Sequence, residues 1–354
     1  MGPHPALAQV RRAVREALAA DRGAHPDRPR VLVACSGGAD SLALAAATAF
    51  EAPRAGYSAG LITVDHAVQP GSAVQAARVA ALGYELGFDP VQTVRVHVGA
   101  AGGPEAAART ARYAALSATA AALDARVLLG HTLDDQAETV LLGLGRGSGP
   151  RSIAGMRAAD GCYLRPLLAL RRSTTRDACT ALGLQPWCDP HNDDAAFQRV
   201  RIRHEVLPLL EDVLQGGVAE ALARTAALLR VDVDALDALT DPVVAASVAR
   251  ALSEVRAPVA DGGLDELDVR ALAALPEAVR TRLLRAWAGA GGADPLSAGH
   301  TAALDELITD WHGQGPVHLP GGRHASRASG RLRIEGGATS TTTDVPPADR
   351  ARQE

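Results

Sequence analysis

Short apolar runs and longer amphipathic segments alternate over the first half of the chain. Four runs rich in β-branched residues or leucine predict buried strands over residues 31–35, 61–64, 94–98 and 127–129. Apolar residues recur at helical spacing between them and predict helices over residues 42–50, 72–86 and 104–123. Repeated strand–helix–strand units predict an α/β fold with a doubly wound parallel sheet. Ligands of such sheets bind at the carboxyl ends of the strands.

The pattern is less regular over residues 154–210. Three X-Pro steps break this segment into turns: Arg165-Pro166, Gln185-Pro186 and Asp189-Pro190. A helical stretch follows over residues 217–239, and a second unit is mostly helical as far as Trp311. Two short apolar runs then predict a hairpin around Pro320-Gly321-Gly322, formed by residues 317–319 and 332–334.

The length of 354 residues exceeds that of one ordinary domain, so we expect two folded units. The α/β domain is expected over residues 1–215, a helical linker over 216–239 and a smaller, mostly helical domain over 240–335. Residues 336–354 are rich in Gly, Thr, Pro and charge, which predicts a disordered tail.

Arginine carries all of the basic charge, because the 36 basic residues include no lysine. The formal net charge is −4, but the charge is unevenly spread. Residues 151–203 hold nine arginines against five acids, and residues 320–334 hold four arginines and no acid. Such stretches predict contacts with phosphate groups, although solvated surface arginines would give the same pattern.

The four cysteines are widely spaced, which argues against a zinc ribbon, a redox motif or a disulfide framework. We expect reduced thiols at Cys35, Cys162, Cys179 and Cys188. The first 19 residues are amphipathic and lack the apolar run of a signal peptide. No stretch approaches the ~20 uncharged apolar residues of a membrane span. We therefore expect a cytoplasmic protein without a membrane segment.

A glycine-rich turn joins the first predicted strand to the helix after it: Ser36-Gly37-Gly38-Ala39-Asp40-Ser41. This geometry directs backbone N–H groups and the positive end of a helix dipole at one anion. A carboxylate beside a phosphate repels it unless a cation bridges them, so we expect Asp40 to hold Mg²⁺ on a pyrophosphate. A tight structural turn would account for the glycines alone.

Two familiar phosphate-binding motifs are absent from this turn. It lacks the lysine of a Walker A motif, which a lysine-free chain cannot supply elsewhere, and it lacks the Gly-x-Gly-x-x-Gly spacing of a dinucleotide fold. The turn resembles the PP-loop, Ser-Gly-Gly-x-Asp-Ser, of enzymes that cleave ATP between the α and β phosphates. The resemblance implies that residues 36–41, here named the phosphate loop, bind ATP.

An acidic motif follows the fourth predicted strand. Residues 129–139 read Leu-Gly-His-Thr-Leu-Asp-Asp-Gln-Ala-Glu-Thr and begin a helix that Thr132 can cap. Asp135 and Glu138 lie on one face of that helix, near the carboxyl end of the strand. An exposed helix face is the alternative interpretation. A metal site that includes His131 is disfavoured, because the motif has no His-x-x-x-His pair.

Arginine-containing segments complete the pattern. Residues 105–113 place Arg109 and Arg112 three apart on a helix and end in Tyr113. Three more segments lie downstream: Arg146-Gly147-Ser148-Gly149, Asp189-Pro190-His191-Asn192 and Phe197-Gln198-Arg199-Val200-Arg201-Ile202-Arg203. This ordered set resembles the tRNA(Ile)-lysidine synthases of the PP-loop ATP pyrophosphatase superfamily, in a short form. The resemblance covers residues 30–211 and, more loosely, 275–277, 282–287 and 319–322.

The resemblance implies an activity and its partners. Enzymes of this family join L-lysine to C2 of the wobble cytidine C34 in the CAU-anticodon tRNA(Ile), through an adenylated cytidine, and release pyrophosphate and AMP. ATP, Mg²⁺, L-lysine and this tRNA are therefore implied, and a homodimer is left open. The implied catalytic residues are Asp40, Arg112, Asp135, Glu138 and Arg203. His66 and His131 are implied beside the nucleotide, with strand-end histidines bonded to backbone as the alternative.

Two departures and three alternatives accompany this interpretation. Val200 stands where this family usually has Asn, and Val68-Gln69 stands where it usually has Leu-Arg. These departures affect the expected contact with tRNA or nucleotide and leave the expected chemistry unchanged. A PP-loop tRNA thiolase would adenylate a base before sulfur transfer, but scattered cysteines suit it poorly. An ammonia-using ligase would need a glutaminase segment, and none is visible. An RNA-binding protein with an inactive nucleotide fold would not need Asp40, Asp135 and Glu138.

Overall fold

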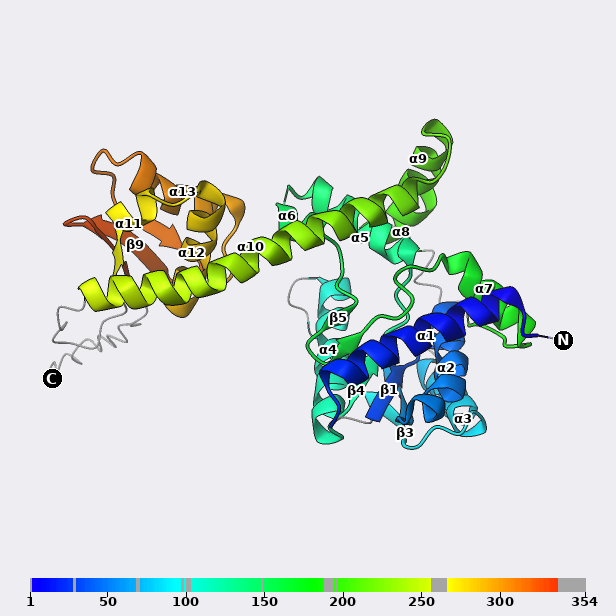
Figure 1. The fold of residues 1–354 in the computed structure, drawn as a ribbon. Helices are drawn as coiled ribbons and strands as arrows, with labels where there is room; N and C mark the ends of the chain where they lie inside the picture. Colours follow the sequence, from blue (N-terminus) through cyan, green and yellow to red (C-terminus); the bar gives the residue numbers. More distant parts are fainter. Residues whose placement is uncertain are drawn as a thin grey trace, which may run out of the picture. The chain divides into compact units, whose positions relative to one another are not determined.

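The computed structural model describes residues 2–27, 30–67, 71–96, 99, 103–147, 149–187, 194, 196–255 and 266–336. The chain divides into two compact units, Met1–Arg230 and Val231–Glu354, which we describe separately (Figure 1). The linker that we expected over residues 216–239 stays a prediction. The expected tail lies outside the described residues, apart from Gly336.

A six-stranded sheet forms the centre of the first unit, in the order β3-β2-β1-β4-β6-β5. Neighbouring strands are parallel except for β5 and β6, so the predicted α/β fold with a mostly parallel sheet is confirmed. The strands are β1 (Arg30–Ala34), β2 (Ser58–Asp65), β3 (Val91–Arg95), β4 (Arg126–Leu128), β5 (Ala159–Asp160) and β6 (Tyr163–Leu164).

Two details of the sheet differ from the prediction. The β5–β6 hairpin lies in a segment that we expected to be irregular, because strands of two residues leave no readable periodicity. β2 and β3 begin at Ser58 and Val91, each three residues before the predicted start. Residues 97 and 98, where the prediction ended β3, lie outside the described residues.

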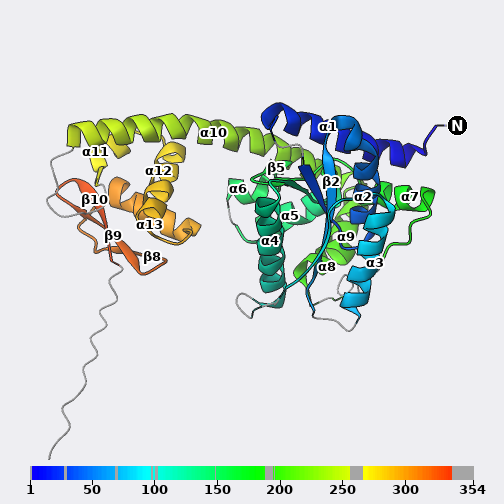
Figure 2. The same cartoon turned by 90° about the horizontal axis from the view of Figure 1, so that it is seen from below.

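Alternate residues of the strands face two different cores. Val31 and Val33 pack in a core that includes residues of α1 (Pro5–Ala24), α2 (Ala39–Glu51), α3 (Ser72–Glu85) and α7 (Arg172–Ala181). Leu32 packs in a second core with Leu116 of α4 (Pro104–Ala122). Figure 2 shows α4 on one side of the sheet and α2 and α3 on the other. Burial of both faces explains why the strand sequences are continuous in aliphatic residues.

A third apolar cluster lies beyond the carboxyl end of β4. It joins α5 (Leu133–Gly145) to α9 (Leu207–Val213) and to the first turns of α10 (Val218–Val255). α10 ends at Val255, whereas the sequence pattern predicted that this helix would end near residue 239. The short helices α6 (Pro150–Ile153) and α8 (Gln198–Arg201) accompany this layer, and a 3-10 turn (Pro53–Ala55) follows α2.

A π-helical turn, Ile202–Val206, separates α8 from α9. The N–H of Leu207 bonds the carbonyl of Ile202, five residues earlier. Pro208 accounts for this widening, because it has no N–H and its ring would clash with the carbonyl four residues before it in a regular helix. Such turns are frequent at functional sites, and this one carries Arg203.

The second unit contains a four-stranded antiparallel sheet in the order β7-β10-β9-β8. Its strands are β7 (Leu267–Asp268), β8 (Val317–Leu319), β9 (Arg323–Ala328) and β10 (Arg331–Glu335), and its helices are α11 (Val269–Ala273), α12 (Glu277–Ala290) and α13 (Ala298–Thr309). The predicted hairpin was wrong in its partner, because β8 pairs with β9 and residues 332–334 belong to a third strand. In the described part of the chain, no helix is both long and apolar enough to cross a membrane.

Candidate active site

The phosphate loop joins β1 to α2, as predicted, and residues 39–41 of the loop form the first turn of α2. Ser41 Oγ accepts the N–H groups of Ser36 and Gly37, each at 3.2 Å, and donates to the Gly38 carbonyl at 2.9 Å. Gly37 has a φ of 89°, which glycine adopts without strain. Gly38 precedes α2 and provides no side-chain cap, so the first N–H groups of the helix can bind an anion.

Gly130 brings the end of β4 against this loop. A Cβ at Gly130 would lie 3.1 Å from the carbonyl carbon and oxygen of Asp40 and 3.2 Å from the amide nitrogen of Ser41. Glycine permits this approach without a shift of either main chain. The acidic motif that follows Gly130 therefore begins directly beside the phosphate loop.

Asp135 and Glu138 lie in the first two turns of α5, on one face as predicted. The backbone N–H and the hydroxyl of Thr132, the N-cap residue, both donate to Asp135 Oδ2 at 2.8 Å. The exposed side-chain fraction is 11% for Asp135 and 0% for Glu138. Burial alone would raise the pKa of Asp135, but the charge of Arg172 and the Thr132 N–H offset it and lower that pKa.

Arg172, the first residue of α7, joins three carboxylates. Its Nη2 donates to Asp135 Oδ1 at 2.7 Å, its Nη1 to Glu138 Oε1 at 3.3 Å and its Nε to Asp40 Oδ2 at 3.4 Å. Its backbone N–H donates to Asp134 Oδ2 at 2.7 Å, which fixes the start of the helix. Burial opposes its charge, but the surrounding carboxylates raise the pKa of Arg172 above its ordinary value.

Asp40 points from the first turn of α2 toward α7. The hydroxyl of Thr175 donates to Asp40 Oδ1, and Arg172 lies at Oδ2. Burial is the largest influence on this carboxyl and raises its pKa, although Thr175 and Arg172 act in the opposite direction. The phosphate loop is thus tied to α7 through the one carboxylate that it carries.

Arg203 approaches the same carboxylates from the π-helical turn. Its Nε donates to Glu138 Oε1 at 2.7 Å and its Nη2 to Glu138 Oε2 at 3.1 Å, while Nη2 also lies 3.4 Å from Asp135 Oδ1. Arg199 Nη2 donates to the Thr139 hydroxyl at 3.2 Å, and its Nε lies 3.9 Å from Glu138 Oε2. We name the resulting group the charge cluster: Asp40, Asp135, Glu138, Arg172, Arg199 and Arg203.

Arg112 and His131 lie beside the charge cluster, close enough for the charge of Arg112 to act on His131. In the described part of the chain, Arg112 makes no ion pair with the carboxylates of the charge cluster. The buried atoms Arg112 Nε and His131 Nδ1 find no hydrogen-bond partner among the described residues. Burial lowers the pKa of His131 to about 3 against the opposing charge of Asp135, and Arg112 and Arg165 lower it further. Burial also lowers the pKa of Arg112. His131 is therefore neutral near pH 7.

The other predicted positions are described only in part. His66 follows Asp65 at the end of β2, where the N–H of Ala67 donates to Asp65 Oδ1 at 2.9 Å. Val200 is buried in α8 at 9% exposure, which suits an apolar side chain where Asn is usual. The predictions that concern Val68-Gln69, Ser148 and residues 188–193 lie outside the described residues. The three described cysteines, Cys35, Cys162 and Cys179, are free thiols.

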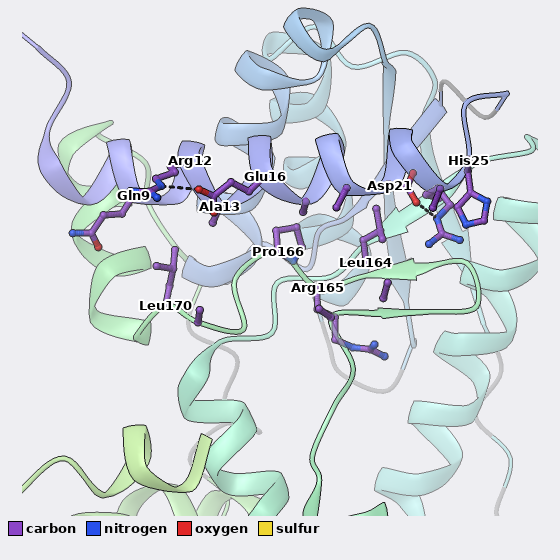
Figure 3. Close-up of a pocket in the computed structure, with 17 residues that line it drawn as sticks. Gln9, Arg12, Ala13, Glu16, Asp21, His25, Leu164, Arg165, Pro166 and Leu170 are labelled. Atoms are coloured by element: carbon purple, nitrogen blue, oxygen red, sulfur yellow. Dashed lines mark hydrogen bonds and ion pairs between the residues drawn. The ribbon is translucent and has the colours of Figure 1, made fainter. Parts of the chain in front are cut away.

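A hollow of 530 Å³ lies between α1 and residues 158–170 (Figure 3). Alanine and leucine form much of its wall, and an ion pair from Arg126 Nε to Asp21 Oδ1 at 2.9 Å lies at one end. No residue predicted for the site is among the described residues that line it. The hollow is therefore separate from the charge cluster.

Sequence reasoning missed Arg172 and Thr175. It counted Arg172 among the nine arginines of a basic stretch that was expected to contact phosphate groups. Two of the nine are largely buried, since Arg165 is 7% exposed and the Arg172 side chain 13%, and contact of the stretch with phosphate stays a prediction. A usable signal was present, since the Arg-Arg-Ser-Thr-Thr segment from Arg171 can begin a helix shortly after Pro166.

Comparison with known families places the chain in a class. Residues 7–210 match the family model of the PP-loop domain, and residues 267–333 match that of the TilS substrate binding domain. The parallel sheet, the phosphate loop and the charge cluster are thus those of a PP-loop protein, a class that uses ATP. The chain belongs, within that class, to the family of tRNA(Ile)-lysidine synthases.

Relatives over nearly the full length show this family. The chain is 56% identical over 337 residues to the tRNA(Ile)-lysidine synthase of Thermobifida fusca, covering 94% of this chain and 98% of that protein. It is 52% identical over 365 residues to that of Streptomyces coelicolor, covering 95% and 100%. The solved structure of the U34-tRNA thiolase NcsA from Methanococcus maripaludis, with its 4Fe-4S cluster, has a TM-score of 0.52 at 18% identity, covering 64% and 80%. This likeness concerns the fold alone.

Proposed function

We propose that the chain uses ATP to join L-lysine to C2 of the wobble cytidine of the CAU-anticodon tRNA(Ile), and releases AMP and pyrophosphate. One observation carries the proposal beside the family membership. A loop that can bind phosphates and a buried pair of carboxylates meet in one charge cluster, joined by Arg172. ATP and a cationic substrate can therefore be held side by side.

The first step activates the base. The C2 oxygen of cytosine is a poor leaving group, so it attacks the α-phosphate of ATP, pyrophosphate leaves, and the oxygen becomes part of an adenylate. The first N–H groups of α2 can stabilise phosphate charge, because Gly38 leaves them uncapped. The base must leave the anticodon stack to reach this place.

The second step transfers lysine. The ε-amino group has an ordinary pKa near 10.4, so free lysine arrives as an ammonium that is not nucleophilic. Asp135 and Glu138 suit this step, because buried carboxylates can bind the ammonium, orient it and accept a proton from it. The amine then attacks C2, the C2–O bond breaks, and AMP carries the oxygen away.

Arg112 and Arg203 are assigned to the stabilisation of negative charge on the phosphate and the reacting base. Arg112 supports this role with a buried Nε that has no partner among the described residues and can donate to a substrate. Arg203 holds Glu138 with two hydrogen bonds and so also fixes the orientation of that carboxylate. His131 and His66 are proposed beside the nucleotide, where a neutral His131 can donate or accept a hydrogen bond without adding charge.

The residues present fit Mg²⁺ bound to ATP. Mg²⁺ in nucleotide sites takes one or two carboxylates and otherwise phosphate oxygens and water. Asp40 offers a single carboxylate in the first turn of α2, where phosphates would bind, and no group of three or more metal-binding side chains exists among the described residues. Mg²⁺ held by Asp40 would neutralise charge on the pyrophosphate group.

The second unit is proposed to bind tRNA, with the arginines of residues 320–334 as contacts to its backbone. Arg331 Nη1 and Arg333 Nε lie 3.6 and 2.6 Å from the carboxylate oxygens of Glu266, and Arg327 lies over the ring of Trp311. Arg327→Glu is expected to weaken tRNA binding. The slope of log affinity against log salt concentration should become less steep by about one unit, the value for one lost phosphate contact. Unchanged affinity and salt slope would remove this assignment. A homodimer and a cytoplasmic location stay predictions.

The central test separates the two steps. Purified protein, ATP, Mg²⁺, labelled lysine and tRNA(Ile) are incubated, and pyrophosphate release and label in tRNA are followed together. Asp135→Asn and Glu138→Gln are expected to abolish lysine transfer and to leave more of the pyrophosphate release. Glu16→Gln, the same change at an exposed residue of α1, serves as control. Equal loss of both steps would refute the division of roles, and no lysine-dependent label with the parent protein would refute the function.

A further inference from the structure

The carboxylates proposed to bind lysine are already occupied by cations of the chain itself. Asp135 Oδ2 accepts both donors of Thr132, and Oδ1 accepts Arg172 Nη2 at 2.7 Å. Both oxygens of Glu138 accept hydrogen bonds from Arg203. Each oxygen of the pair thus has a donor already, and since a carboxylate oxygen accepts about two hydrogen bonds, a lysine ammonium would either share these oxygens with the arginines or take the place of one of their bonds.

The bond lengths indicate which arginine can release an oxygen. Arg203 makes a compact two-bond pair with Glu138 at 2.7 and 3.1 Å, a geometry that is strong for guanidinium and carboxylate. Arg172 divides its donors among three carboxylates and makes one short bond, while its contacts to Glu138 and Asp40 are 3.3–3.4 Å long. Arg172 is therefore the arginine with the longer and more divided hydrogen bonds to this pair, while its positive charge is stabilised by all the surrounding carboxylates together.

The position of Arg172 also limits how it can move. Its backbone N–H is fixed by Asp134 at 2.7 Å, so α7 stays in place while the long side chain can change its rotamer. Asp40, on the phosphate loop, is the carboxylate within its reach that does not belong to the lysine-binding pair. A guanidinium that leaves Asp135 can thus stay neutralised by Asp40.

We propose that Arg172 is a positioning residue that occupies the place of the lysine ammonium between Asp135 and Glu138, and that transfers its contacts to Asp40 when lysine binds after pyrophosphate has left. The proposal rests on the proposed function. Arg172 offsets the negative charge of the two buried carboxylates before the substrate arrives. It competes with lysine for them, and it links lysine binding to the orientation of the carboxylate on the phosphate loop.

The test measures KM for lysine and kcat for lysine transfer separately. Removal of an internal competitor strengthens apparent substrate binding, so Arg172→Ala is expected to lower KM for lysine ~3- to 10-fold. Loss of the contact to Asp40 is expected to lower kcat at least about ten-fold. A merely structural residue would reduce the amount of active protein and leave KM unchanged. An unchanged or higher KM for lysine overturns the proposal.

Chemical rescue gives an independent measurement. Free guanidinium at millimolar concentration is expected to raise kcat of the Arg172→Ala protein and to raise its KM for lysine, because it fills the vacated place. The parent protein and Arg12→Ala, which removes an exposed arginine of α1, should show neither effect. The absence of rescue together with an unchanged KM rejects a stand-in role for Arg172.

Two further variants guard against a folding defect. Arg172→Met keeps much of the side-chain volume without the charge, and its thermal unfolding is compared with that of the parent. It is expected to show the same lower KM as Arg172→Ala, whereas Arg172→Lys, which restores a cation, should return KM toward the parent value. If the parent fails to incorporate lysine, the proposed function fails. If it succeeds and none of these variants lowers KM, this inference alone fails.

Discussion

Arg203 and Glu138, 65 residues apart in the sequence, form two hydrogen bonds, from Nε to Oε1 at 2.7 Å and from Nη2 to Oε2 at 3.1 Å. The Glu138 side chain has no exposed surface, whereas 24% of the Arg203 side chain is exposed. The pair joins α5 to the π-helical turn before α9. Loss of Arg203 therefore leaves a fully buried charge with one counter-charge fewer, whereas loss of Glu138 leaves an arginine that is partly exposed to water.

Removal of one partner from this pair is expected to destabilise the first unit. Arg203→Ala leaves the buried Glu138 with Arg172 and Arg199 as its remaining counter-charges and should lower the free energy of unfolding by about 1.5–3 kcal/mol, measured by urea denaturation. The double variant Arg203→Met with Glu138→Leu should recover most of this loss while lysine transfer stays absent. A double variant no more stable than Arg203→Ala would show that the pair itself, rather than an unpaired charge, decides stability.

The buried imidazole of His131 predicts a pH dependence of stability. Its folded-state pKa is about 3 and its unfolded value near 6.5, so the unfolded state binds more protons between these values. This group therefore lowers stability as pH falls below 6.5, by up to about 1.4 kcal/mol per pH unit. His131→Gln should unfold with a shallower loss between pH 6.5 and 5 than the parent. Parallel curves for the two proteins would contradict a buried neutral histidine.

Thr132 connects helix capping to the charge of Asp135. Thr132→Ala removes one of the two donors to Asp135 Oδ2 and should lower the free energy of unfolding by about 0.5–2 kcal/mol. It should also weaken lysine binding, because the carboxylate loses a restraint on its orientation. Thr132→Ser keeps the hydroxyl and is the matched control. Equal KM values for lysine in the two variants would limit Thr132 to a structural role.

The second unit has an ion pair of its own. Arg280 Nε and Nη2 lie 2.6 and 2.9 Å from the two carboxylate oxygens of Asp305, and Nη1 donates to the Leu275 carbonyl. Asp305→Ala should destabilise this unit by about 3–5 kcal/mol, since Arg280 is 8% exposed. Hydrogen exchange should rise in α12 and α13 and stay unchanged in the phosphate loop. Faster exchange in the loop would show that the units do not unfold independently.

The periodicity of apolar residues predicted the elements that are long enough to show a pattern of buried and exposed positions. β1, β4 and the central part of β2 are buried on both faces, so their sequences are rich in aliphatic residues, whereas β3 is only partly buried and includes Gln92, Thr93 and Arg95. The β5–β6 hairpin has two residues in each strand, and its position depends on pairing with β4 rather than on local pattern. In the second sheet, residues 317–319 and 332–334 were predicted as strands, but β9 between them has few apolar residues, and β7 consists of two residues that pair with a distant β10.

The candidate site was predictable where its residues follow strand ends. Asp40, Asp135 and Glu138 occur in motifs next to β1 and β4, and the parallel sheet brings those ends together. Arg172 has no such motif, and its contact with Asp40 joins residues 132 positions apart. Local sequence could indicate the start of α7 but not the carboxylates that this start would meet. Because Arg172 was counted only as one charge of a basic stretch, its position at the centre of the cluster was not predicted.

Gly130 limits which sequences this site can adopt. Its missing Cβ would lie 3.1 Å from the Asp40 carbonyl, whereas a Cβ at Gly38 would meet nothing nearer than the Ser36 hydroxyl at 3.8 Å. A saturation library should therefore return glycine alone among active clones at position 130 and several small residues at position 38. Position 130 is therefore restricted by the distance between two main chains. A substitution elsewhere cannot compensate for a Cβ at this position, because the atoms that the Cβ would meet belong to the main chain.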